Sequence, residues 1–153
     1  MTTIVVDPRN LRMVSDSQVS DQDAGLKYEQ DKVYAVPGGW MGAAGAIVDI
    51  QKALRYVRGE LKRKPRMSFE NTFVMLTADG AYSATSGLDW QREDAPIAIG
   101  SGAMAAEAVL RLGYSAEEAV EMACKIDLMS SGPVKVYTLD NTEPTVWEKK
   151  SGR

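Results

Sequence analysis

The sequence predicts an α+β fold in which antiparallel sheets are covered by helices. Runs of β-branched and apolar residues recur at strand length, and many are separated only by turn residues, which is typical of hairpins. Helical segments lie between these blocks of strands. Because hairpins join most of the strands, antiparallel sheets are favoured over a parallel one. A length of 153 residues, 44% of them hydrophobic, suits a single domain that spans residues 1–153.

The predicted strands are separated by recognisable turns. Pro8-Arg9-Asn10 lies between the first two strands, Pro37-Gly38-Gly39 between the next two, and Asp79-Gly80 between a third pair. Ile97-Ala98-Ile99 predicts a short buried strand, and the last pair flanks Asp140-Asn141. The predicted strands are residues 3–6, 12–14, 32–36, 40–44, 73–78, 81–86, 97–99, 134–139 and 145–147.

The first predicted helix covers residues 47–61. Its end is indicated by Lys62-Arg63-Lys64-Pro65, because cations followed by proline are typical of a helix C-terminus. We therefore interpret this basic run as a solvated cap and not as a binding patch. The apolar residues that define one buried stripe along this helix are Ile47, Ile50, Leu54, Val57 and Leu61.

Two further helices are predicted close together, over residues 103–112 and 116–129. Gly113 ends the first of them, and Ser115 with Glu118 forms a capping box at the start of the second. One face of the second helix is expected to belong to the core, with Ala119, Met122, Ala123 and Ile126 along it.

Composition excludes several classes of protein. A net charge of −3 argues against a surface for nucleic acid or anionic membranes. No apolar run approaches the roughly 20 residues that span a bilayer, and the start of the chain is too short and polar for a secretory signal. The single Cys124 excludes an internal disulfide and fits a reducing cytoplasm. We expect Cys124 to pack within a helix layer, and we expect no metal or cofactor.

The absence of histidine narrows the possible chemistry most. Without it the chain can form neither a Ser-His-Asp triad, nor a Cys-His pair, nor an imidazole-ligated metal site. A nucleophile that carries its own base is still available. Thr2 follows the initiator methionine, and removal of Met1 would free its α-amine, whose ordinary pKa is about 7.7–8.0. That amine lies one carbon away from the hydroxyl that it would deprotonate.

The chain resembles the N-terminal-nucleophile threonine peptidases of the proteasome β-subunit and HslV type. Each motif is weak alone, but their order and spacing, with threonine at position 2, match the family across almost the whole chain. The motifs are Thr2-Thr3-Ile4-Val5, Ser15-Asp16-Ser17-Gln18, Asp31-Lys32-Val33, Ala44-Gly45-Ala46-Ile47-Val48-Asp49, Gly100-Ser101-Gly102 and Asp127-Leu128-Met129-Ser130-Ser131-Gly132.

The resemblance implies a four-layer αββα sandwich of two antiparallel sheets and a set of site residues. Thr2 would be the nucleophile, Lys32 a buried cation that favours negative charge on its oxygen, and Asp16 the group that holds Lys32. The Gly45 N–H would stabilise the oxyanion. The remaining members, which would orient the amine and its water, are Ser101, Asp127 and Ser130.

The chain also departs from the family pattern. Only a short basic connection stands between Leu61 and Phe73, where the family has a second long helix, so one helical layer should be reduced. Ser15 replaces a glycine before Asp16, and the second glycine of the Gly45 motif is absent.

The resemblance implies a subunit of a self-compartmentalising peptidase. Its substrate would be a polypeptide, its assembly a homo-oligomeric ring, and a further partner an ATPase unfoldase. Two alternatives stay open: an amidohydrolase of the same nucleophile class that cleaves a small amide, and a catalytically inactive ring subunit. The combination of Thr2, Asp16 and Lys32 argues against the inactive subunit, because a scaffold has no need of all three.

Overall fold

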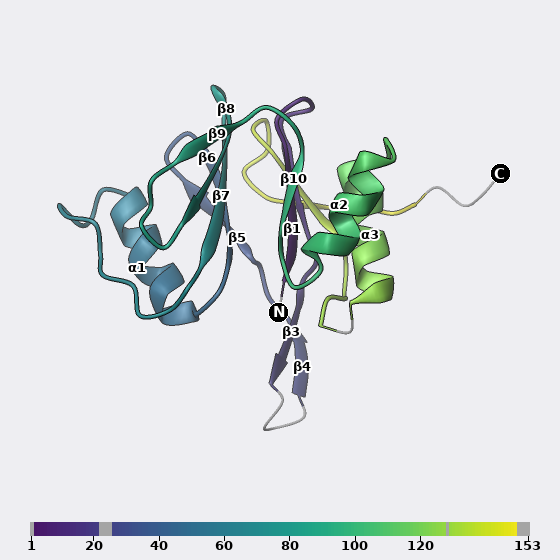
Figure 1. The fold of residues 1–153 in the computed structure, drawn as a ribbon, viewed down its shortest axis with the longest axis horizontal. Helices are drawn as coiled ribbons and strands as arrows, with labels where there is room; N and C mark the ends of the chain where they lie inside the picture. The colour runs from purple at the N-terminus through teal and green to yellow at the C-terminus, as the bar shows by residue number, and fades with distance from the viewer. Residues whose placement is uncertain (1, 22–25, 128, 150–153) are drawn as a thin grey trace.

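The computed structural model describes residues 2–21, 26–127 and 129–149, which form four layers (Figure 1). Helix α1 (Ile47–Val57) covers one outer face, and α2 (Ala103–Arg111) with α3 (Ala116–Ile126) covers the other. Two five-stranded antiparallel sheets lie between these helical layers. The predicted αββα sandwich, with its reduced layer on the α1 side, is confirmed.

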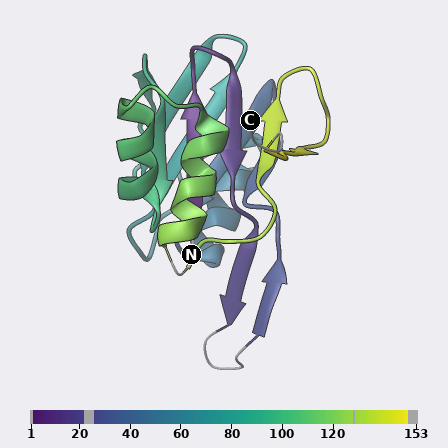
Figure 2. The ribbon, with the colours of Figure 1, turned by 90° about the vertical axis from the view of Figure 1, so that its right-hand side faces the viewer.

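The first sheet has the order β10-β1-β2-β11-β12. Strand β1 is an inner strand of this sheet, and it pairs with β10 through Thr3 and Gly100 and with β2 through Ile4 and Ser15. The strands are β1 (Thr3–Asp7), β2 (Arg12–Ser15), β10 (Ile97–Gly100), β11 (Lys135–Thr138) and β12 (Thr145–Val146). Figure 2 shows α2 and α3 side by side over one face of this sheet.

The second sheet has the order β5-β6-β7-β8-β9 and is built from consecutive hairpins. Its strands are β5 (Val33–Val36), β6 (Gly39–Ala44), β7 (Thr72–Thr77), β8 (Gly80–Thr85) and β9 (Gln91–Glu93). Every strand predicted from the sequence has a counterpart in one of the two sheets. Strand β9 has no predicted counterpart, because it is short and charged and carries no apolar face.

A separate hairpin of β3 (Gln18–Asp21) and β4 (Leu26–Glu29) is also absent from the sequence prediction. It projects beyond the two sheets, next to the N-terminal end of the chain (Figure 1). The Gln30 N–H donates to the Ser17 carbonyl at 2.8 Å and so closes its base. Each of its strands has only four residues, too few for an alternating pattern to stand out in the sequence.

Three apolar clusters fill the spaces between the layers. Ile4 and Val6 of β1 point into the space between the sheets, where they meet Val74 and Leu76 of β7. Val5, on the opposite face of β1, packs against the alanine-rich faces of α2 and α3. A third cluster joins α1 to the second sheet. All five residues of β1 are buried because both of its faces are covered.

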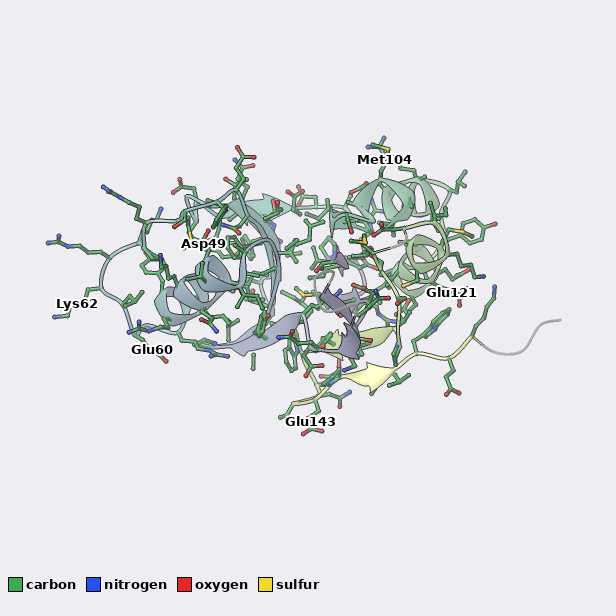
Figure 3. All side chains as sticks on the ribbon, turned by 90° about the horizontal axis from the view of Figure 1, so that it is seen from below. Asp49, Glu60, Lys62, Met104, Glu121 and Glu143 are labelled. Atoms are coloured by element: carbon green, nitrogen blue, oxygen red, sulfur yellow. The ribbon has the colours of Figure 1, made fainter. Side chains whose placement is uncertain are left out.

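Helix α1 ends at Val57, four residues earlier than the sequence predicts. The Glu60 N–H bonds the Arg55 carbonyl and the Gly59 N–H bonds the Tyr56 carbonyl, which is the Schellman arrangement. Gly59 has φ +81°, a conformation that favours glycine. The basic run therefore follows the helix without capping it, and Lys62 projects away from the molecule (Figure 3).

The predicted apolar stripes are only partly buried. On α1, Ile50 and Leu54 are buried, whereas Ile47 is 53% exposed because it lies at the first turn and overhangs a cavity. On α3, Ala119 and Ala123 are buried as expected, but Met122 and Ile126 are exposed; Ala116 and Val120 complete the buried face. Helix α3 ends at Ile126, before the predicted boundary.

The capping box at the start of α3 is confirmed. The Ser115 hydroxyl accepts a hydrogen bond from the Glu118 N–H at 3.1 Å. Within the described residues, no helix is long and apolar enough to cross a bilayer.

We expect Gly59→Ala to lower the free energy of unfolding by about 1 kcal/mol, because a side chain at positive φ is strained. Gly87→Ala is the matched control: Gly87 is also an exposed loop glycine, but its φ lies outside the left-handed region. Urea unfolding measures both variants. Equal stability of the two variants would show that the Schellman turn does not fix the end of α1.

Candidate functional site

The buried carboxylate of Asp16 fixes the start of β1. Asp16 directly follows β2 and has no exposed surface. Its Oδ1 accepts the Thr3 N–H at 2.9 Å, and its own N–H donates to the Thr3 carbonyl at 3.1 Å. Both backbone groups of Thr3 are thus held by one residue, and Thr2 is presented at the end of the strand.

Lys32 and Asp16 form a buried ion pair directly beside this strand end. The Lys32 Nζ donates to Asp16 Oδ2 at 2.8 Å, and the lysine side chain is 7% exposed. Burial lowers the pKa of Lys32, while the neighbouring carboxylate opposes that shift. Burial likewise raises the pKa of Asp16 against the effect of Lys32. A further N–H, from Ser131, reaches Asp16 Oδ2 at 3.2 Å.

A chain of hydroxyl groups connects Asp127 to the first strand. Asp127 follows α3, and its Oδ2 accepts hydrogen bonds from Ser101 at 2.6 Å and from Ser130 at 2.7 Å. The Ser130 hydroxyl also lies 2.7 Å from the Thr3 hydroxyl. Burial acts to raise the pKa of Asp127, but these hydrogen bonds and the Met129 N–H bring it below its ordinary value.

Thr2 borders a cavity of about 430 Å³ between the ends of the two sheets. Thr2 is half-buried, and its carbonyl oxygen lies 3.5 Å from Ser101 Oγ and from the Gly102 N–H. The other polar residues on the wall include Lys32, Gly45 and Ser101, and the apolar side of the wall is formed by Tyr34, Ala43, Ile47 and Ile50.

Gly45 forms the turn between β6 and α1 on the far wall of this cavity. No described residue accepts a hydrogen bond from its N–H, so this donor is available to a ligand. The next residue, Ala46, has φ −78° and ψ 130°, an ordinary extended conformation. This conformation does not require a glycine at residue 46. The Ala46 N–H is bonded by the side chain of Asn71 at 2.9 Å.

The structure brings the predicted site residues together around one cavity. Four of them line it, and Asp16 lies behind Lys32; Ser130 and Asp127 are linked to Ser101 by the hydroxyl chain. Two participants were not predicted from sequence, Thr3 and Asn71. Thr3 gives a weak signal as a polar residue at an inward position of a buried strand, whereas Asn71 lies in a connection with no periodic pattern.

Among the residues that the structure describes, neither Cys124 nor the acidic side chains form a second reactive centre. Burial raises the pKa of the Cys124 thiol to about 12, so this half-buried residue is unreactive and packs in the helix layer as expected. Across residues 2–21, 26–127 and 129–149, no three acidic or cysteine side chains are grouped so that they could hold a metal ion.

No protein-family model matches the sequence, and no curated protein matches it significantly. The fold is similar to eukaryotic HslV from Trypanosoma brucei, with a TM-score of 0.66 and 22% identity over 88% of this chain and 97% of that one. It is also similar to BPH from Thiobacillus denitrificans, free (14% identity) and in complex with epoxomicin (13%). For both BPH structures the TM-score is 0.66, and the match covers 88% of this chain and 96% of theirs. Identities this low establish a shared fold.

We expect Lys32→Met to lower the free energy of unfolding by about 3 kcal/mol, because it leaves the Asp16 carboxylate buried without its cation. Lys135→Met is the matched control: it breaks an ion pair of 2.7 Å, but the partner Asp31 is 58% exposed, and the expected cost is below about 1 kcal/mol. Urea unfolding at pH 7 compares them. Equal losses would contradict a stabilising role for the buried pair.

The same variant gives a pH signature. Without Lys32, the pKa of Asp16 in the folded protein rises further above that of the unfolded chain, so the folded state binds the extra proton. The difference in free energy of unfolding between wild type and Lys32→Met is therefore smallest below about pH 4, and it grows as the pH rises. A difference in free energy of unfolding that does not change with pH would contradict the assignment of Asp16 as the titrating partner of Lys32.

Proposed function

We propose that the chain is a threonine-type endopeptidase subunit of the HslV and proteasome kind, with Thr2 as the nucleophile after removal of Met1. The observation that carries the proposal is the arrangement around the cavity. Thr2 borders the same space as Lys32 and the unpaired Gly45 N–H, and Lys32 is held by the buried Asp16.

In the proposed reaction, Thr2 Oγ attacks the carbonyl carbon of a peptide bond while the α-amine of Thr2 accepts the hydroxyl proton, directly or through water. The positive charge of Lys32 favours negative charge on Oγ. It also keeps the nearby amine from being protonated too readily, because like charges disfavour each other.

The tetrahedral intermediate carries negative charge on the former carbonyl oxygen, and the Gly45 N–H donates to it. One such donor contributes about 3–4 kcal/mol in the transition state. Collapse then expels the leaving amine, which takes the proton from the α-amine, and an ester to Thr2 remains. A water activated by the same amine hydrolyses that ester. Ser101, Asp127 and Ser130 orient the amine and its water.

The walls of the cavity suggest the kind of peptide that it accepts. Tyr34, Ala43 and Ile50 surround a space suited to an apolar side chain next to the cleaved bond. The similar fold of HslV, and of a BPH that binds epoxomicin, supports a peptidase. As part of the same proposal, the cytoplasmic subunits form a ring around a chamber, and an ATPase unfoldase supplies polypeptides to it.

We expect purified active protein to begin at Thr2 by intact-mass measurement, and Thr2→Ala to reduce hydrolysis of a leucine-ending fluorogenic peptide to background. Thr2→Ser should keep measurable activity, because it retains both hydroxyl and amine. Circular dichroism should be unchanged in both variants, since β1 is anchored from Thr3 onward. Epoxomicin should add its mass to the wild type and not to Thr2→Ala.

Three outcomes would contradict the proposal. Activity from protein that retains Met1 on every chain would exclude the free amine as base. Wild-type rates from Thr2→Ala would exclude the nucleophile, and an inactive wild type that assembles into rings would favour the inactive-subunit alternative.

We also expect a closed homo-oligomer, because a peptidase with an accessible nucleophile must be sequestered from other proteins. Multi-angle light scattering at micromolar concentration measures the mass. A stable monomer that cleaves small amides but not peptides would favour the amidohydrolase alternative.

A further inference from the structure

We propose that Asn71 is a positioning residue that, with Asp49, aims the Gly45 N–H into the cavity. The inference rests on the proposed function and adds to it a residue outside the motif set. It is carried by a buried hydrogen-bond network behind the turn between β6 and α1. Asn71 and Asp49 are 4% and 0% exposed, so neither reaches substrate.

Asn71 bonds that turn from behind. Its Oδ1 accepts the Ala46 N–H at 2.9 Å, which leaves the preceding N–H, that of Gly45, as the free donor of the turn. Without this acceptor, two adjacent N–H groups would be unpaired and the peptide between them could rotate. Fixing one donor therefore sets the direction of the other.

Asp49 in turn fixes Asn71. The Asn71 Nδ2 donates to Asp49 Oδ2 at 2.9 Å and to the Phe69 carbonyl at 2.9 Å. Asp49 lies in the first turn of α1 and also accepts the N–H groups of Ser68 and Phe69. The Asn71 hydrogen bond, helped by these N–H groups, lowers the pKa of Asp49 and keeps it charged. Figure 3 shows Asp49 on the α1 side of the molecule and Met104 on the α2 side.

The position of Asn71 also requires glycine at residue 45. Gly45 has φ +150°, and a Cβ built there would lie 2.0 Å from Asn71 Oδ1. The amide group therefore occupies the space that a side chain at 45 would need. An asparagine suits this place because it presents an acceptor to Ala46 and a donor to Asp49 from one planar group.

The test measures kcat and KM for peptide hydrolysis in Asn71→Ala, with rates divided by the folded fraction that circular dichroism measures, so that only folded sites are counted. We expect kcat to fall about a hundredfold, the size of effect known for small misplacements of catalytic groups, while KM changes little. A merely structural role would lower the melting temperature and leave kcat per folded molecule unchanged.

Asn10→Ala is the matched control. Asn10 likewise donates from Nδ2 to a buried aspartate, Asp7, at 2.8 Å, but in the β1–β2 turn at the other end of β1 from Thr2. We expect its kcat to match wild type.

A rescue variant tests the geometry directly. Asp49→Asn combined with Asn71→Asp exchanges the two side chains: the carboxylate at 71 still accepts the Ala46 N–H and the amide at 49 donates to it, but the Phe69 carbonyl loses its donor. We therefore expect the exchange to restore kcat in part, to a value above that of Asn71→Ala and below wild type. Ser86→Ala, which removes a hydroxyl bonded to Asn71 at 2.9 Å from its N–H and 3.1 Å from Nδ2, provides a milder variant if Asn71→Ala does not fold; its kcat should fall by a smaller factor.

The outcomes separate this inference from the proposed function. Wild-type activity that depends on Thr2, together with unchanged kcat in Asn71→Ala or Ser86→Ala, would overturn the role of Asn71 and leave the peptidase assignment standing. Wild-type protein without Thr2-dependent hydrolysis would overturn both.

Discussion

The buried carboxylate of Asp16 holds several elements of this molecule together. Asp16 accepts hydrogen bonds from Thr3, Lys32 and Ser131, which come from the start of β1, the residue before β5 and the segment after α3. A carboxylate without exposed surface is costly unless its oxygens are bonded. The same contacts that satisfy it therefore join both sheets and the α3 segment at one point. Thr2 lies directly at that junction.

The reduced helical layer has a structural compensation. The connection from residue 58 to 71 contains no helix among its described residues, yet it is not merely a loop. Its backbone donates N–H groups from Ser68 and Phe69 to Asp49, and its last residue bonds the Gly45 turn. The connection between α1 and β7 thus supports the wall of the cavity. Hydrogen bonds from this connection therefore hold the Gly45 turn in place.

Much of the architecture could be predicted because its signals are local. The sequence directly indicates the hairpins, through their glycine or proline turns. It likewise indicates the capping box at Ser115. The predicted end of α1 was wrong because the prediction relied on the basic run Lys62-Arg63-Lys64-Pro65. The residue that ends the helix is Gly59. Asn71 could not be found at all. Its partners Ala46 and Asp49 are more than twenty residues away, and no spacing rule connects a single asparagine to them.

The anchoring of β1 begins at Thr3, one residue after the proposed nucleophile. Pairing with β10 and β2, and both backbone bonds to Asp16, are complete without any contribution from the amine of Thr2. The register of β1 therefore does not depend on whether a residue precedes Thr2. Under the proposed mechanism, a chain that keeps Met1 would reach the same fold and remain latent, so removal of Met1 would change the chemistry of the site and not the fold.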